Sequence, residues 1–117
     1  ETARALQGLH YLLEQGEHPL QILAMLGRQI RILIQVSELR KQGLVPPEIA
    51  GQLGLAPWMV DKFIDQAKKF DMAQLEAAHR RLVDTDWAIK TGKLEDTLAL
   101  DLLVVGLGQR PARRSPA

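Results

Sequence analysis

This 117-residue chain contains histidines and carboxylates, which can bind metals or act in catalysis, but their spacing does not bring them together at one site. His79, Asp84 and Asp86 are potential metal ligands within one predicted helix. Because residues two apart do not share a helix face, these three side chains do not converge on one ion. His10 is a lone histidine in an apolar helical pattern, and we expect it at the surface or half-buried. The sequence therefore predicts no metal site.

Signatures of catalysis are also missing from the sequence. The chain contains no cysteine, which excludes a thiolate nucleophile, a disulfide framework and a Cys-based zinc site. It contains no Gly-rich phosphate loop, no His pair at ligand spacing and no nucleophile elbow. We expect no catalytic, cofactor-binding or metal-binding residue. A small helical enzyme with an unrecognised site remains an alternative.

The distribution of charge argues against a body that binds phosphates. The formal net charge is +1, from 15 basic and 14 acidic residues. Arg110, Arg113 and Arg114 lie in a final segment without acids, so the first 107 residues hold 12 basic side chains and all 14 acidic ones. Proteins that bind nucleic acid by neutralising phosphates usually have a basic body. No signal peptide or membrane-length apolar run is present.

The elements that would position any site are helices. The longest apolar pattern covers residues 19–42, starts at a proline and stops before Gly43. Its polar residues form one narrow stripe, so we expect a central helix that is buried on most sides. Further helices are predicted at 2–15 and from Asp71 to about Thr91. Asp71 and Gln74 resemble a capping box at the start of the latter.

Two short helices are predicted between residues 47 and 69. Pro47 and Pro57 suit their first positions, and Gly54 ends the first of them. The apolar residues also follow the pattern of a helix-turn-helix, whose second helix could enter a DNA major groove. That helix carries two aspartates and no Arg, Asn, Gln or Ser near its start to recognise bases. We favour a packing role, and DNA binding through residues 47–69 is the alternative.

The last predicted helix, 94–107, is apolar on nearly every side. Between residues 98 and 107 only Asp101 and Gly106 are not apolar, and Glu95 and Asp96 are expected in the first turn. In so small a domain, we expect part of the cover for such a helix to come from another protein chain.

We expect a subunit interface formed by residues of the last helix and of the central helix. The interface residues predicted are Leu98, Leu102, Val105, Arg28 and Arg31. On the preceding helix, Asp86 and Lys90 stand four residues apart in the favoured acid-to-base order. We expect them to form a structural ion pair.

Three stretches of the sequence resemble one known family. They are GEHPLQILAMLGRQIRILIQVSELRKQG, EIAGQLGLAPWMVDKFIDQAKKF and LVDTDWAIKTGKLEDTLALDLLVVGL. Together they are similar to the C-terminal domain of the delta subunit of the bacterial DNA polymerase III clamp loader, over nearly all of residues 16–107. The most specific parts are PLQILAMLGRQIRIL and the D-x-x-I-K-T-G run at residues 86–92, which is followed by LALDLL.

The resemblance implies a non-catalytic oligomerisation domain. In this family, AAA+ regions precede a helical C-terminal domain, and five such domains form a collar. The delta subunit opens the sliding clamp without hydrolysing ATP. The implied partners are clamp-loader subunits of the delta prime and tau/gamma types, bound through their collar domains. The sliding clamp and primed DNA are reached only through the whole cytoplasmic complex, with no cofactor and no membrane contact.

The fold that we expect is all-α, a compact orthogonal bundle of five to six helices of the clamp-loader collar type. It forms a single domain over residues 1–108, followed by a disordered basic tail at 109–117. Because the chain opens with Glu1, directly in helical sequence, we expect a C-terminal fragment of a longer protein. By resemblance, that protein is a subunit of a DNA-directed DNA polymerase holoenzyme.

Overall fold

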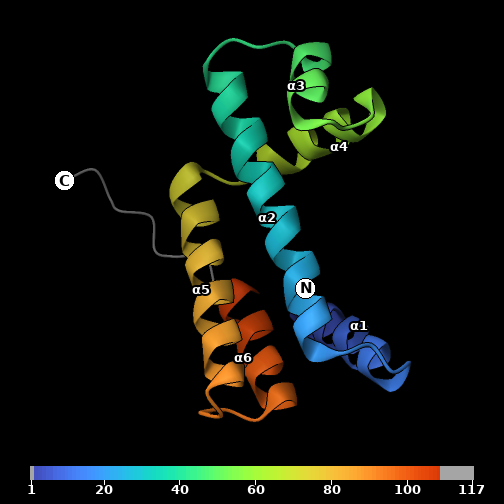
Figure 1. Cartoon of the computed structure of the whole chain (residues 1–117), viewed down its shortest axis with the longest axis vertical. Helices are drawn as coiled ribbons and strands as arrows, with labels where there is room; N and C mark the ends of the chain where they lie inside the picture. The colour runs from blue at the N-terminus through green and yellow to red at the C-terminus, as the bar shows by residue number, and fades with distance from the viewer. Residues whose placement is uncertain (1, 109–117) are drawn as a thin grey trace, which may run out of the picture. The chain divides into compact units, whose positions relative to one another are not determined.

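The computed structural model of the protein describes residues 2–108, and this part of the chain is all-α (Figure 1). It contains six helices and no strand within those residues. They are α1 (Thr2–Glu14), α2 (Pro19–Lys41), α3 (Pro46–Leu53), α4 (Pro57–Ala67), α5 (Met72–Lys90) and α6 (Asp96–Gly108). The predicted fold class and helix number are confirmed. The predicted tail at 109–117 lies outside the described residues.

Prolines and glycines set the bounds of the short helices. The first begins at Pro46, one residue before the predicted Pro47, because the first turn of a helix leaves its N–H groups free and so accepts both prolines. The amide of Val45 donates to the Glu48 carboxylate over 3.0 Å. Gly54 ends α3 in the left-handed region, with φ of 67°, and its N–H donates to the Ala50 carbonyl.

Acidic residues stand at the start of the two later helices. The capping box predicted before α5 is confirmed, since Gln74 N donates to Asp71 Oδ1 over 2.7 Å and Asp71 N donates to Gln74 Oε1 over 2.9 Å. The prediction for α6 was wrong by two residues, because the helix starts at Asp96 and not at residue 94. Glu95 therefore precedes the helix and caps it, where the sequence pattern had suggested a place in the first turn.

The described chain gathers into two compact units. Residues 28–77 form one unit, and the remainder of the described chain forms the other. Both long helices, α2 and α5, pass from one unit into the other. The single domain expected over residues 1–108 stays a prediction.

The unit of residues 28–77 is built on the pairing of α3 with α4. Ile49 and Val60 are fully buried in this unit, and Val36 of α2 is buried as completely. The cluster around them consists of Leu33, Val36, Ile49, Ala50, Val60, Phe63, Ile64, Ala67 and Leu75. Every member of this cluster lies within residues 28–77, so the unit has a core of its own.

The other unit places α1 against α6 and holds α5 beside α6 (Figure 1). Its buried apolar side chains come from four helices. They are Leu9 of α1, Ile22 and Leu23 of α2, Leu82 of α5, and Ala99, Leu100 and Leu103 of α6.

The prediction that the long helix is buried on most sides was wrong for α2. Among its side chains only Ile22, Leu23, Leu33 and Val36 are buried, and Met25 is 52% exposed. The physical reason is that α2 is shared between two units. Its buried side chains fall into two groups, Ile22 and Leu23 in one unit and Leu33 and Val36 in the other, so an apolar arc that is wide in the sequence is covered over part of its width.

Candidate functional site

A stripe of exposed apolar side chains runs along α6. On one side of this helix, Ala99, Leu100 and Leu103 are buried in the core. The residues predicted from the sequence as interface lie away from that face, and their exposed fractions are 49% for Leu98, 52% for Leu102 and 37% for Val105. Their spacing of four and three residues places them on one helix face. We call these three residues the α6 stripe.

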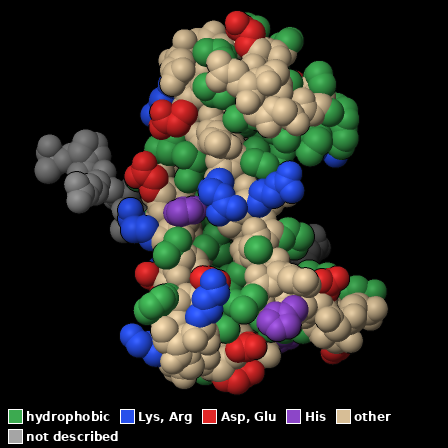
Figure 2. All heavy atoms as spheres, in the orientation of Figure 1, with side chains coloured by type: hydrophobic (Ala, Val, Ile, Leu, Met, Phe, Trp, Pro, Cys, Tyr) green, Lys and Arg blue, Asp and Glu red, His purple; other side chains and the backbone are tan. Residues whose placement is uncertain are grey.

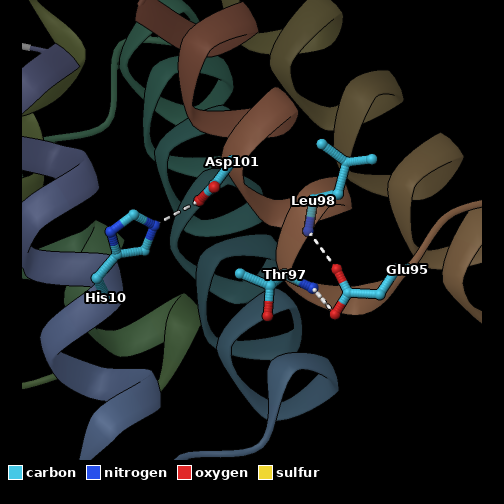
Figure 3. Close-up of polar contacts among 5 residues, drawn as sticks. All are labelled: His10, Glu95, Thr97, Leu98 and Asp101. Carbon is cyan, nitrogen blue, oxygen red and sulfur yellow. Dashed lines mark hydrogen bonds and ion pairs between the residues drawn. The ribbon is translucent and has the colours of Figure 1, made fainter.

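The start of α6 is held by Glu95, the residue that precedes it (Figure 3). One carboxylate oxygen accepts from Thr97 N over 3.1 Å, and the other accepts from Leu98 N over 2.9 Å. The bond from Leu98, followed by the bond from Thr97, lowers the pKa of Glu95 because both favour the charged carboxylate. The first residue of the α6 stripe is therefore anchored through its own backbone amide.

A polar contact between α1 and α6 borders the α6 stripe. His10 Nε2 lies 2.8 Å from Asp101 Oδ1, and Figure 3 shows the ring and the carboxylate pointing toward each other. Their side chains are 49% and 34% exposed. Asp101 comes three residues after Leu98 and four before Val105, so it stands at the edge of the α6 stripe. No motif in the sequence indicates this contact, because its partners are 91 positions apart.

The other residues predicted from the sequence lie as follows. Arg28 and Arg31 are exposed on the part of α2 that belongs to the unit of residues 28–77, whereas the α6 stripe belongs to the other unit. On α5, Lys90 Nζ lies 2.9 Å from Asp86 Oδ2, which is the geometry of an i,i+4 ion pair. The side chain of Lys90 is 57% exposed and that of Asp86 is 38% exposed, so the pair contributes little to stability.

The α3–α4 pair adds no support to the DNA-binding alternative. Trp58, in the first turn of α4, is 62% exposed, and Lys62 Nζ lies 5.3 Å from its ring centroid. This lysine is therefore engaged in a cation–π contact at the end of the helix that would enter a groove. On the face that Figure 2 shows, the surface over these two helices is mostly hydrophobic and uncharged with little Lys or Arg, where a phosphate-binding face would gather basic side chains.

Residues 2–108 contain neither a cluster of metal ligands nor a helix suited to cross a membrane. In this part of the chain no three His, Cys, Asp or Glu side chains come together in a way that could hold a metal ion. None of its helices combines the length and the apolar character that crossing a membrane requires.

Comparisons with known proteins point to one family. The family model described as the DNA polymerase III delta subunit, C-terminal domain, matches residues 1–107. The chain is 32% identical over 116 residues to the DNA polymerase III subunit delta of Bacillus subtilis (strain 168), which covers 99% of this chain and 33% of that protein.

The structure is similar to the solved Bacillus subtilis DNA clamp loader delta protein, with a TM-score of 0.83 and 32% identity. That match covers 90% of this chain and 31% of the other. The chain thus spans about a third of the length of the relatives that it matches.

Proposed function

This chain belongs to the family of C-terminal domains of the DNA polymerase III delta subunit, and on that premise we propose that it is a non-catalytic oligomerisation domain. It would hold its subunit in the pentameric collar of a clamp loader that places the sliding clamp on primed DNA during replication. The observation that carries the proposal is the α6 stripe, three large apolar side chains left open on a helix whose opposite face is buried.

The physical support is the free energy that a partner would gain by covering the α6 stripe. Full burial of one large aliphatic side chain is worth about 1.5–3 kcal/mol relative to exposure. The three side chains are already partly covered, so a partner helix gains roughly a few kcal/mol at most by covering them. A complex at micromolar concentration needs about 8 kcal/mol, so the α6 stripe supplies one part of the interface and the contacts around it supply the rest.

The proposed partners are the collar domains of clamp-loader subunits of the delta prime and tau/gamma types. The exposed guanidinium groups of Arg28 and Arg31 would supply polar contacts to such a neighbour. Through the whole complex, the domain would be part of a DNA polymerase holoenzyme in the cytoplasm. In this proposal it takes no cofactor and does not touch the sliding clamp or DNA by itself.

The test is to mix this chain with the full-length delta prime and tau/gamma-type subunits and to measure complex formation by size-exclusion chromatography with light scattering, at low micromolar concentration. We expect a complex with the unaltered chain and none with Leu102→Asp, because a carboxylate cannot be buried in an apolar contact without a partner. Val83→Asp is the matched control, since Val83 is an apolar residue of α5 that is 54% exposed.

Circular dichroism separates the possible failures. Leu102 is 52% exposed, so its substitution leaves the free energy of unfolding within about 0.5 kcal/mol. If Leu102→Asp and Val83→Asp bind equally well, the α6 stripe is not the interface. If Leu102→Asp unfolds the chain, Leu102 belongs to the core and the interface lies elsewhere. No complex with the unaltered chain would count against the proposal itself.

A further inference from the structure

Arg81 of α5 lies against Gly106 in the last turns of α6. A Cβ built on Gly106 would lie 3.0 Å from the guanidinium carbon of Arg81 and 3.5 Å from its Nε, and closer still to one terminal nitrogen. No other group approaches that position more closely. Gly106 is buried, Arg81 as a whole is exposed, and the guanidinium lies against the position that a Gly106 side chain would take.

The glycine makes room for the arginine. Glycine inside a helix is unfavourable relative to alanine, and the two helical glycines Gly8 and Gly51 have nothing within 4 Å of a Cβ. At Gly106 the space is filled by a guanidinium, and an added methyl group would displace it. The Arg81 guanidinium therefore occupies the space that a side chain at position 106 would fill.

This charge borders the α6 stripe near the end of the helix. Gly106 follows Leu102 by four residues, so it lies one turn further along the same side of the helix. On the other edge, Asp101 already has His10 as its partner. Among the described residues, no carboxylate lies within 4.0 Å of the Arg81 guanidinium. The rim of the stripe thus carries the positive charge of Arg81, which has no acidic partner within 4.0 Å among the described residues.

We propose that Arg81, seated on Gly106, is a specificity-determining residue of the docking surface, and that it pairs with a carboxylate of the helix that covers the α6 stripe. The inference rests on the proposed function of that stripe. A partner helix reduces the access of water to the rim, and a charge there then favours an opposite charge on the partner. The planar guanidinium fits an Asp or Glu carboxylate with two parallel hydrogen bonds.

The pairing would also fix the register of the complex. Arg81 lies beside the last turns of α6, so the partner must present its acid there when its apolar residues meet Leu102 and Val105. A helix that is apolar but has a basic residue at that point would meet a like charge. The α6 stripe alone supplies attraction to any apolar helix, and Arg81 supplies the discrimination among such helices.

The test compares three variants of this chain against the unaltered one. The dissociation constant with full-length delta prime and tau/gamma-type subunits is measured at low and at high salt. Arg81→Glu reverses the charge, Gly106→Ala displaces the guanidinium but keeps its charge, and Arg80→Glu is the control. Arg80 is an exposed neighbour on α5, turned about 100° around the helix from Arg81.

We expect Arg81→Glu to weaken binding about tenfold at low salt, and less at high salt, as a rim charge facing an acid does. Gly106→Ala is expected to weaken binding roughly threefold while raising the thermal midpoint of the chain, because alanine is the better helix former. Arg80→Glu stays within about twofold of the unaltered chain, the size of a general charge effect.

Equal effects of Arg81→Glu and Arg80→Glu, or a loss with Arg81→Glu that does not respond to salt, would overturn the role of Arg81. In that case, if Leu102→Asp still abolishes the complex, the proposed function stands without the further inference. No binding by the unaltered chain would overturn both.

Discussion

Glu95 is a single side chain on which the start of α6 depends. Its folded-state pKa is lowered from the ordinary value of 4.5 by hydrogen bonds from Leu98 N and Thr97 N. A lowered pKa means that the contribution to stability is present in full above the unfolded value and is lost as the pH falls through the folded one.

The variant that tests this is Glu95→Gln. We expect the unaltered chain to be the more stable of the two at neutral pH. The difference in free energy of unfolding should shrink as the pH falls below 4.5 and level off below the folded pKa. Urea unfolding followed by circular dichroism at a series of pH values measures it. A difference that is constant across the series would show that the charge of Glu95 plays no part.

Asp71 at the start of α5 can be tested in the same way without a change of pH. Its side chain accepts from Gln74 N over 2.7 Å. Asp71→Ala leaves that amide without a partner and is expected to lower the free energy of unfolding by about 1 kcal/mol, whereas Asp71→Asn keeps the acceptor and should stay close to the unaltered chain. Equal losses from both variants would mean that the cap contributes through charge alone.

Residue contacts that repeat at short spacing could be predicted from the sequence, and contacts across the fold could not. Asp71 and Gln74 of the capping box are three positions apart, so helical geometry was sufficient to predict their contact. His10 and Asp101 are 91 positions apart, and neither belongs to a motif that would pair them. The contact of Arg81 with Gly106 also joins two different helices, and only packing between them brings it about.

Among the elements, α2 and α6 show that the periodicity of apolar residues does not always identify the buried face of a helix. When apolar residues occupy most sides of a helix, their pattern does not say which side faces the core. For α2 this led to a prediction of burial that Met25, 52% exposed, contradicts. For α6 the residues predicted as interface are exposed, which is necessary for that role, and the interface itself stays a prediction.

The turn between α3 and α4 offers a matched pair of substitutions. Gly54 has a φ of 67°, and a Cβ there would meet nothing within 4 Å, so the cost of Gly54→Ala is purely that of the backbone. We expect a loss of about 1–2 kcal/mol in the free energy of unfolding. Gly51 lies inside α3 with equally open surroundings, and Gly51→Ala is expected to gain up to about 1 kcal/mol.

Chemical denaturation of the two variants measures both values. If the free energy of unfolding falls for Gly54→Ala and rises for Gly51→Ala, backbone conformation and not the surrounding space decides the effect of an added methyl group. If Gly54→Ala were neutral, the end of α3 would have to relax out of the left-handed conformation, and the α3–α4 turn would be less strictly fixed than its geometry indicates.

At the scale of the whole molecule, the two units have separate cores but share their long helices. The cluster around Ile49 and Val60 lies entirely within residues 28–77, and the buried residues of α1 and α6 belong to the other unit. Because hydrophobic stabilisation acts through contacts, a cavity in one core removes contacts among the residues of that core. The helices α2 and α5 run through both units, so they form a covalent link between the two cores.

Hydrogen exchange of Ile49→Ala tests how far the units unfold separately. The substitution truncates a fully buried side chain and is expected to cost about 2–5 kcal/mol. We expect backbone amides of α3 and α4 to lose protection by a correspondingly large factor, while those of α1 and α6 change little. Leu100→Ala, in the core of the other unit, is the reciprocal control and should give the opposite pattern. Equal loss of protection in all helices from either variant would mean that α2 and α5 couple the two cores into one cooperative body.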